Sequence, residues 1–125
     1  MSQSFEPFHA RGFRFACAIV HLYMKLAKLP AVPPHLARQV LRSGTSVGAN
    51  LEEAKGAQSR RDLAAKFSVA LKEARETAYW LRLMEATTIA PAEIVGPLRA
   101  EAGELIAILT VSRRKLNTKA RSGTK

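Results

Sequence analysis

The sequence predicts an all-α protein, an up-down-up-down antiparallel four-helix bundle in a single domain. Apolar residues recur at spacings of three and four along four segments, and no segment alternates with the period of two that is typical of strands. Prolines and glycines separate the four segments, and the connections are short, which favours antiparallel neighbours. With 125 residues, 47% of them hydrophobic, the chain is long enough for one domain with its own core.

We expect the four helices at about residues 11–28, 34–55, 59–86 and 91–116. The prolines within 30–34 separate the first two helices, because proline disrupts a helix interior but suits a first helical position. Ser59 and Asp62 resemble a capping box at the start of the third helix. In the fourth, Gly96-Pro97 predicts a kink or a late start. Residues 1–116 are thus expected to form the bundle, and residues 117–125 a basic C-terminal tail.

Several classes of protein are excluded by the sequence. No apolar run reaches the ~18 residues of a membrane span, so we expect no membrane association. Cys17 is the single cysteine, which excludes an intrachain disulfide and fits a reducing compartment. The N-terminus lacks the layout of a secretory signal. We therefore expect a cytoplasmic protein.

The first predicted helix is apolar on two sides, because no Asp, Glu, Lys or Arg lies between Arg14 and Lys25. One apolar stripe consists of Phe13, Ala16, Val20, Tyr23 and Ala27, and the second of Phe15, Ile19, Leu22 and Leu26. A surface helix of a monomeric bundle buries a single face, so two stripes predict a homo-oligomer. We assign its interface to the second stripe, Phe15, Ile19, Leu22 and Leu26. The alternative is a deep core with scattered exposed apolar residues.

The chain is basic, and the charge is concentrated near its C-terminus. The net charge is +10, and residues 112–125 contain six basic residues and no acidic one. A basic region attracts polyanions, which makes RNA or DNA the expected partner, whereas the alternative is a solubilising tail. The end of the fourth helix should lie beside the start of the antiparallel third. This placement predicts one basic patch of Arg60, Arg61, Arg113, Arg114, Lys115, Lys119 and Arg121.

Catalytic chemistry finds no support in the sequence. His9, His21 and His35 are scattered and lack metal-ligand spacing, so we expect no metal, no cofactor and no catalytic residue. Glycines within 44–48 do not form a phosphate-binding loop, because they lack the Gly-Lys-Ser/Thr ending and a preceding strand. We expect a non-enzymatic accessory factor that binds nucleic acid. The alternative is a scaffold that binds a partner protein and has no nucleic-acid role.

Two sequence blocks resemble a known family. The first block is RSGTSVGAN at residues 42–50, continuing to Glu53-Ala54, and the second contains ALKEA at 70–74, then Glu76-Thr77 and Tyr79-Trp80-Leu81. Together they resemble the bacterial four helix bundle protein family, which includes proteins encoded in intervening sequences of large-subunit ribosomal RNA genes. That family is distantly related to the accessory variability proteins of diversity-generating retroelements.

The resemblance implies a left-handed up-down bundle and, from characterised relatives, a homopentamer. The retroelement branch also implies nucleic acid and a reverse transcriptase as partners. The family's polar positions match Arg42, Asn50, Glu53 and Glu76, which we expect to form a buried polar network between the second and third helices. A ligand or partner site, or solvated surface charges, are the alternatives for these four residues.

The small and aromatic residues of the two blocks have packing roles that follow from their chemistry. Small residues of the first block, among them Gly44 and Gly48, let a neighbouring helix approach closely, and packing must offset their low helix propensity. Tyr79 and Trp80 are adjacent and point in different directions, so at most one reaches the core centre. We expect Trp80 in the core or at a seam, with base stacking as the alternative.

Overall fold

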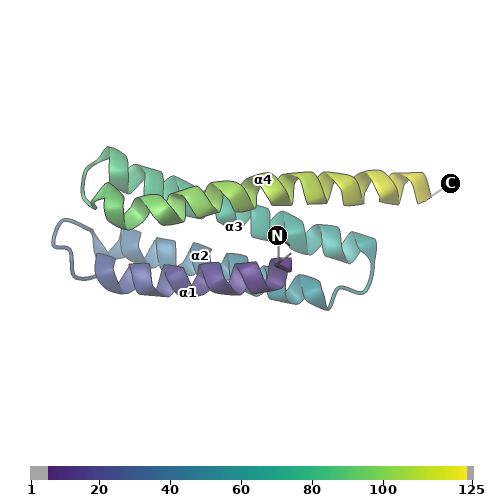
Figure 1. Cartoon of the computed structure of the whole chain (residues 1–125), viewed down its shortest axis with the longest axis horizontal. Helices are drawn as coiled ribbons and strands as arrows, with labels where there is room; N and C mark the ends of the chain where they lie inside the picture. The colour runs from purple at the N-terminus through teal and green to yellow at the C-terminus, as the bar shows by residue number, and fades with distance from the viewer. Residues whose placement is uncertain (1–5, 124–125) are drawn as a thin grey trace, which may run out of the picture.

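The computed structural model describes residues 6–123, with side chains described through Thr118, and confirms the four-helix bundle. The helices are α1 (Phe8–Leu26), α2 (Pro34–Lys55), α3 (Arg60–Ala86) and α4 (Ala92–Gly123). Figure 1 shows them running alternately up and down, with the C-terminal part of α4 projecting past the start of α3. Within the described residues there is no strand. None of these helices has both the length and the apolar composition needed to cross a membrane.

The third helix begins with the expected capping box. Ser59 Oγ accepts a hydrogen bond from the backbone N–H of Asp62 at 3.0 Å, and the Asp62 carboxylate accepts one from the backbone N–H of Gln58 at 3.1 Å. Each bond satisfies an N–H group for which the helix itself provides no acceptor. The acidic Asp62 also lies at the positive end of the helix dipole. These bonds fix where the connection from α2 turns into α3.

The fourth helix begins at Ala92, close to the expected residue 91, but it ends later than expected. It does not start late at Gly96-Pro97, because the carbonyl of Pro91 already accepts hydrogen bonds from Ile94 and Val95 at 3.0 and 3.2 Å. That turn is complete before Pro97 is reached, and the helix continues through the proline. The helix also runs past Leu116 to Gly123, since no proline or glycine lies between these two residues. The basic segment expected as a separate tail therefore extends α4.

Helices that follow one another in sequence pack together most extensively. α1 packs on α2, α2 on α3 and α3 on α4, whereas α1 and α4 touch least. Arg11 of α1 bridges this thinnest contact, with ion pairs of 2.7 Å to Glu101 and 2.7 Å to Glu104 of α4. The two carboxylates favour the charged guanidinium and raise the pKa of Arg11. Arg11, a half-buried charged residue, thus links α1 to α4 where these neighbouring helices have the least contact.

Three glycines allow α1 and α2 to approach closely. A Cβ atom built on Gly44 would lie 2.6 Å from Ile19 Cγ1, and one on Gly12 would lie 2.8 Å from Leu51 Cδ1. At Gly48 the nearest atom would be the backbone oxygen of Gly12, at 2.7 Å. A side-chain end can rotate away from such a contact, but a backbone oxygen cannot move unless the helix moves. This confirms that the small residues of α2 serve helix packing.

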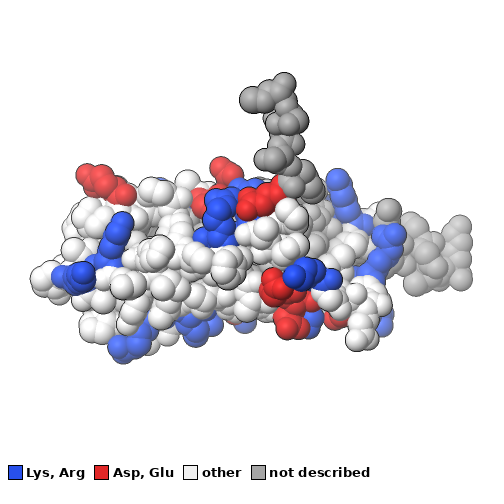
Figure 2. Space-filling model, turned by 60° about the horizontal axis from the view of Figure 1, so that its bottom comes forward, with Lys and Arg blue, Asp and Glu red and all other residues white. Residues whose placement is uncertain are grey.

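The interface assigned to Phe15, Ile19, Leu22 and Leu26 is wrong. These side chains are at most 3% exposed and lie in the core of a single chain, because α1 turns this stripe toward α2 and the bundle interior. The other side of α1 faces outward, and its Phe13, Val20 and Met24 are 68%, 40% and 57% exposed. Figure 2, turned so that the α1 side comes forward, shows a largely uncharged area left of its centre.

We predict that Gly48→Ala destabilises the protein. The added methyl group would meet the backbone oxygen of Gly12 and push α1 away from α2, which should cost about 1–3 kcal/mol even though alanine favours a helix. Chemical denaturation measures this loss as a lower midpoint.

The matched control is Gly103→Ala in α4, where the added Cβ would have nothing within 4 Å. This variant should raise the free energy of unfolding by ~0.5–1 kcal/mol, because only helix propensity changes. Equal effects of the two substitutions would contradict the close helix approach.

Candidate nucleic-acid interface

A cleft of about 560 Å³ lies where the start of α3 meets the C-terminal part of α4. Its apolar floor consists of Leu63, Phe67 and Leu116. Arg60 lines it from α3, and Arg114 and Lys115 line it from α4. The antiparallel arrangement therefore brings the two predicted basic groups together at one end of the bundle.

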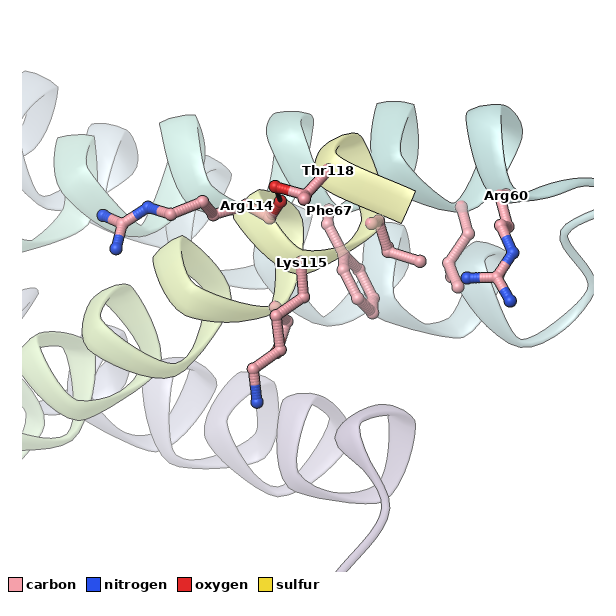
Figure 3. Close-up of a pocket in the computed structure, with 8 residues that line it drawn as sticks. Arg60, Phe67, Arg114, Lys115 and Thr118 are labelled. Atoms are coloured by element: carbon pink, nitrogen blue, oxygen red, sulfur yellow. Dashed lines mark hydrogen bonds between the residues drawn. The ribbon is translucent and has the colours of Figure 1, made fainter. Parts of the chain in front are cut away.

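The charged ends around this cleft point in different directions. Figure 3 shows the Arg60 and Arg114 guanidinium groups at opposite ends of the view, and the Lys115 ammonium pointing toward a third side. Such a spread does not converge on one phosphate group. Because a nucleic-acid backbone presents phosphates at regular intervals, the spread fits several phosphates of an extended polyanion better than one small anion.

The other predicted basic residues have different positions. Arg61 is exposed and Arg113 half-buried, and neither lines the cleft, although both belong to the same end of the bundle. Lys119 and Arg121 lie in the last turns of α4, and their side chains fall outside the described ones. None of the described basic residues at this end (Arg60, Arg61, Arg113, Arg114 and Lys115) forms an ion pair. Their charges are therefore available to a partner.

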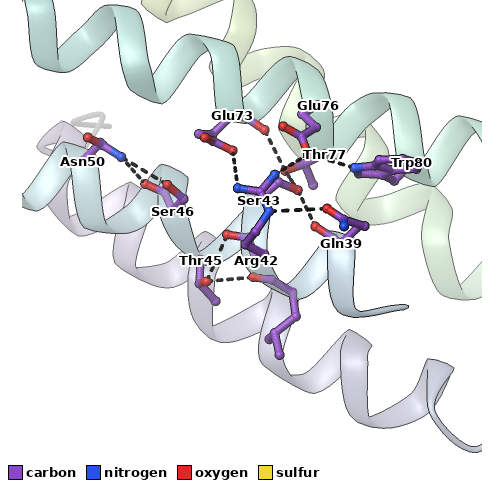
Figure 4. Close-up of polar contacts among 11 residues, drawn as sticks. Gln39, Arg42, Ser43, Thr45, Ser46, Asn50, Glu73, Glu76, Thr77 and Trp80 are labelled. Carbon is purple, nitrogen blue, oxygen red and sulfur yellow. Dashed lines mark hydrogen bonds and ion pairs between the residues drawn. The ribbon is translucent and has the colours of Figure 1, made fainter. Parts of the chain in front are cut away.

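The predicted polar network exists in part, between α2 and α3. Arg42 of α2 forms ion pairs with Glu76 and, at 3.4 Å, with Glu73 of α3 (Figure 4). Trp80 donates its indole N–H to Glu76 at 3.2 Å. Glu73 and Trp80 were not among the residues predicted for this network, although they lie three residues before and four after Glu76 on the same helix face. This spacing relative to Glu76 is the sequence feature that could have indicated both residues as members of the network.

Asn50 and Glu53 are not part of this network. The Asn50 side chain donates to the backbone oxygen of Ser46 at 2.8 Å, a bond within α2 (Figure 4). Glu53 is exposed, and no hydrogen bond or ion pair involves its side chain. Both residues follow Arg42 by two to three turns, which carries them along α2 away from Glu76. The expectation that all four polar residues pair in the interior is corrected accordingly.

A second α2–α3 contact is buried completely. Thr77 Oγ1 of α3 and Ser43 Oγ of α2 are hydrogen-bonded at 2.8 Å, and both residues are 0% exposed. Ser43 Oγ donates its hydrogen to the Gln39 carbonyl at 2.9 Å and accepts from Thr77, whose single hydroxyl hydrogen is shared between Ser43 Oγ and the Glu73 carbonyl, each 2.8 Å away. Every buried polar side-chain atom among the described residues has a partner. This bond fixes the register of the two helices.

The Arg42–Glu76 ion pair makes stability depend on pH. The Arg42 guanidinium, and to a smaller extent the Trp80 N–H, lower the pKa of Glu76 below its ordinary 4.5. A carboxyl group whose pKa is lowered by folding stabilises the protein when ionised, so its contribution is present above the ordinary pKa. That contribution disappears as the pH falls through the lowered pKa of the folded state. The side chain of Arg42 is 50% exposed, and solvent therefore screens the pair.

We predict that Glu76→Gln makes the free energy of unfolding depend less on pH in the acid range. At neutral pH the variant should lose about 1 kcal/mol, the upper range for a screened ion pair. The difference from the parent protein should shrink as the pH is lowered below 4.5. Urea denaturation across the acid range measures both effects. Glu53→Gln is the matched control, and an equal loss in both variants would show that the ion pair contributes nothing specific.

No group of three or more His, Cys, Asp or Glu residues in the described part of the chain could hold a metal ion. Cys17 is free and exposed on α1.

Of the two adjacent aromatic residues, Trp80 is half-buried and hydrogen-bonded, whereas Tyr79 is exposed. Of these two rings, Tyr79 is therefore the more accessible to solvent.

Comparison with known proteins identifies the family. The model of the 23S rRNA-intervening sequence protein family matches residues 9–111. A similar solved structure is a protein of unknown function from the S23 ribosomal protein family of Bacteroides thetaiotaomicron. It is 39% identical, with a TM-score of 0.74, and the match covers 82% of this chain and 94% of that one. No curated protein matches this chain. The family match and the solved relative both cover most of the bundle, and the chain therefore belongs to the 23S rRNA-intervening sequence protein family.

Proposed function

We propose that this protein is a non-enzymatic accessory factor that binds RNA or DNA through the basic end of the bundle. The observation that carries the proposal is the cluster of unpaired cations at that end. Arg11, Arg14, Arg42, Lys55 and Arg99 are each neutralised by a carboxylate, whereas Lys25, Lys28 and Arg38 at the opposite end form no ion pair but do not line the cleft. The cations around the cleft have no such partner and rim an apolar floor. The proposal rests on this surface, because the description of the solved relative assigns it no function.

We further propose that the chain self-associates through the outer face of α1, defined by Phe13, Val20 and Met24. These residues are spaced by seven and four positions, which places them on one side of the helix. Their exposure supports an interface with a second copy of the chain, because contiguous exposed apolar surface marks association sites. An oligomer would repeat the basic end, and binding to a long polyanion would gain by avidity.

The exposed apolar face also favours a second candidate function, a scaffold that binds a partner protein. In that case the positive charge of the basic end would be incidental. The two functions differ in one measurable property: only nucleic-acid binding through phosphates weakens steeply as salt is raised.

We predict salt-dependent binding that needs the basic end. The triple variant Arg60→Gln, Arg114→Gln and Lys115→Gln should bind a random-sequence RNA more weakly at low salt. Its log–log salt slope should be smaller by ~2–3 units, since three phosphate contacts are lost. Fluorescence anisotropy across a salt series measures both quantities.

The matched control removes the same charge from the opposite end of the bundle, with Lys25→Gln, Lys28→Gln and Arg38→Gln, all exposed. This control should keep the slope of the parent protein. Equal slopes in the two triple variants would exclude the basic end as the site. If the parent protein binds no RNA or DNA even at low salt, the scaffold function replaces this proposal.

We predict that the parent protein has a solution mass several times 13.7 kDa and that Val20→Glu with Met24→Glu lowers it to that of one chain. Both side chains are exposed in a single chain, so the variant should fold, whereas an interface between copies would bury two unpaired charges. Light scattering gives the mass, and circular dichroism checks the fold. A parent protein that is already monomeric would refute self-association.

A further inference from the structure

A second concave site lies between α3 and α4, away from the basic end. This groove has a volume of about 370 Å³. Its α3 side, at residues 75–82, begins just over two turns after Phe67, the last α3 residue that lines the cleft at the basic end. Arg75, Tyr79 and Arg82 line it from α3, and Arg99, Gly103 and Ile106 from α4, with Ala78 also in its wall.

Tyr79 provides the groove with an exposed aromatic surface. The residue is 49% exposed, and its hydroxyl forms no hydrogen bond within the described part of the chain. The Trp80 ring contacts it edge-on, with 5.3 Å between the ring centroids. The Arg82 guanidinium lies over the Tyr79 ring, 5.9 Å from its centroid. A positive charge and a flat aromatic surface are therefore found together.

Two of the three guanidinium groups in the groove are not neutralised. Arg99 forms an ion pair with Glu85 at 2.6 Å, which accounts for one positive charge. Arg75 and Arg82 form no ion pair. Arginine presents several N–H donors in a planar fork that matches the oxygens of a phosphate group. The groove thus offers phosphate donors beside a stacking surface.

Gly103 has no packing reason to be glycine. A Cβ atom there would have nothing within 4 Å, whereas one on Gly12, Gly44 or Gly48 would meet its neighbours at 2.6–2.8 Å. A glycine within a helix lowers helix stability, so an exposed one in the middle of α4 needs another explanation. Gly103 lines the groove, where a larger side chain would occupy the free volume. The absence of a side chain at Gly103 therefore leaves this volume free.

We propose that this groove binds one nucleotide unit, an unpaired base with its phosphate, as supplied by a single-stranded nucleic acid. The base stacks against Tyr79 above Gly103, and the phosphate is held by Arg75 and Arg82. Stacking on an aromatic side chain needs an unpaired base, so a duplex is not a ligand of this site. The groove uses none of the residues of the basic end, and this inference stands independently of the function proposed for that end.

Trp80 reports directly on the groove, because it is the only tryptophan and contacts Tyr79. Titration with a short oligouridylate should change Trp80 fluorescence in a saturable way, and a duplex RNA of the same length should not. Adenosine monophosphate is titrated in parallel. A response to the monophosphate as strong as that to the oligomer identifies a free nucleotide as the source, whereas a response to the oligomer alone identifies a strand.

The decisive variant is Gly103→Leu, which fills the groove. It should weaken oligouridylate binding about tenfold or more and raise the thermal midpoint, because leucine favours a helix. Loss of binding then cannot be attributed to unfolding. Ala100→Leu, at an exposed α4 position outside the groove, is the matched control and should bind as the parent does. Tyr79→Ala should weaken binding about tenfold, and Tyr79→Phe should preserve it, because stacking does not need the hydroxyl.

Unchanged binding by Gly103→Leu or by Tyr79→Ala would overturn the proposal. The triple variant of the basic end separates the two sites. If it retains the Trp80 response, the groove binds by itself, whether or not the basic end binds nucleic acid. If it abolishes the response while Gly103→Leu preserves it, the binding belongs to the basic end and the groove proposal is wrong.

Discussion

The close approach of α1 to α2 is the constraint on which the other contacts of the bundle depend. Gly48 lies against the backbone oxygen of Gly12, and Gly44 lies against Ile19, so the distance and rotation of the two helices are fixed together. This rotation directs Phe15 and Ile19 inward and leaves Val20 outside. The two apolar sides of α1 therefore have different roles, and only one of them belongs to the core of the chain. One serves the core, and the other remains available for association.

Charge is distributed over the bundle in a way that separates structural from available cations. The paired arginines, Arg11 and Arg42, connect neighbouring helices at the α1–α4 and α2–α3 contacts. Arg60, Arg75 and Arg114 form no ion pair and border the two concave regions that involve α3 and α4. Other unpaired cations, such as Lys25 and Lys28, lie outside these regions, so the concave regions differ in that their cations border apolar or aromatic side chains. Net charge alone does not reveal this arrangement.

The sequence could predict the helices, their order and the Ser59 cap, because these depend on local periodicity and on capping chemistry. It also predicted that Arg60 and Arg114 would lie at the same end of the bundle, since antiparallel order alone places them there. It could not decide which stripe of α1 faces outward, because that rotation depends on glycine contacts between two helices. Nor could it predict the partners of Asn50 and Glu53. Their position on one helix face does not show which residue of a neighbouring helix lies opposite them. The α3–α4 groove requires side chains from two helices, and no spacing within one helix indicates it.

The glycines of this chain illustrate how a single residue type carries two different kinds of information. Gly12, Gly44 and Gly48 are explained by contact, because any side chain there would meet an atom of the neighbouring helix. Gly103 has the same intrinsic cost to its helix but faces open space. Gly96 in the same helix also lacks a close contact, with Glu85 Oε2 3.7 Å away, but it does not line the groove between α3 and α4. Gly103 does border Tyr79 and two arginines without carboxylate partners, and this combination favours a ligand in the groove between α3 and α4.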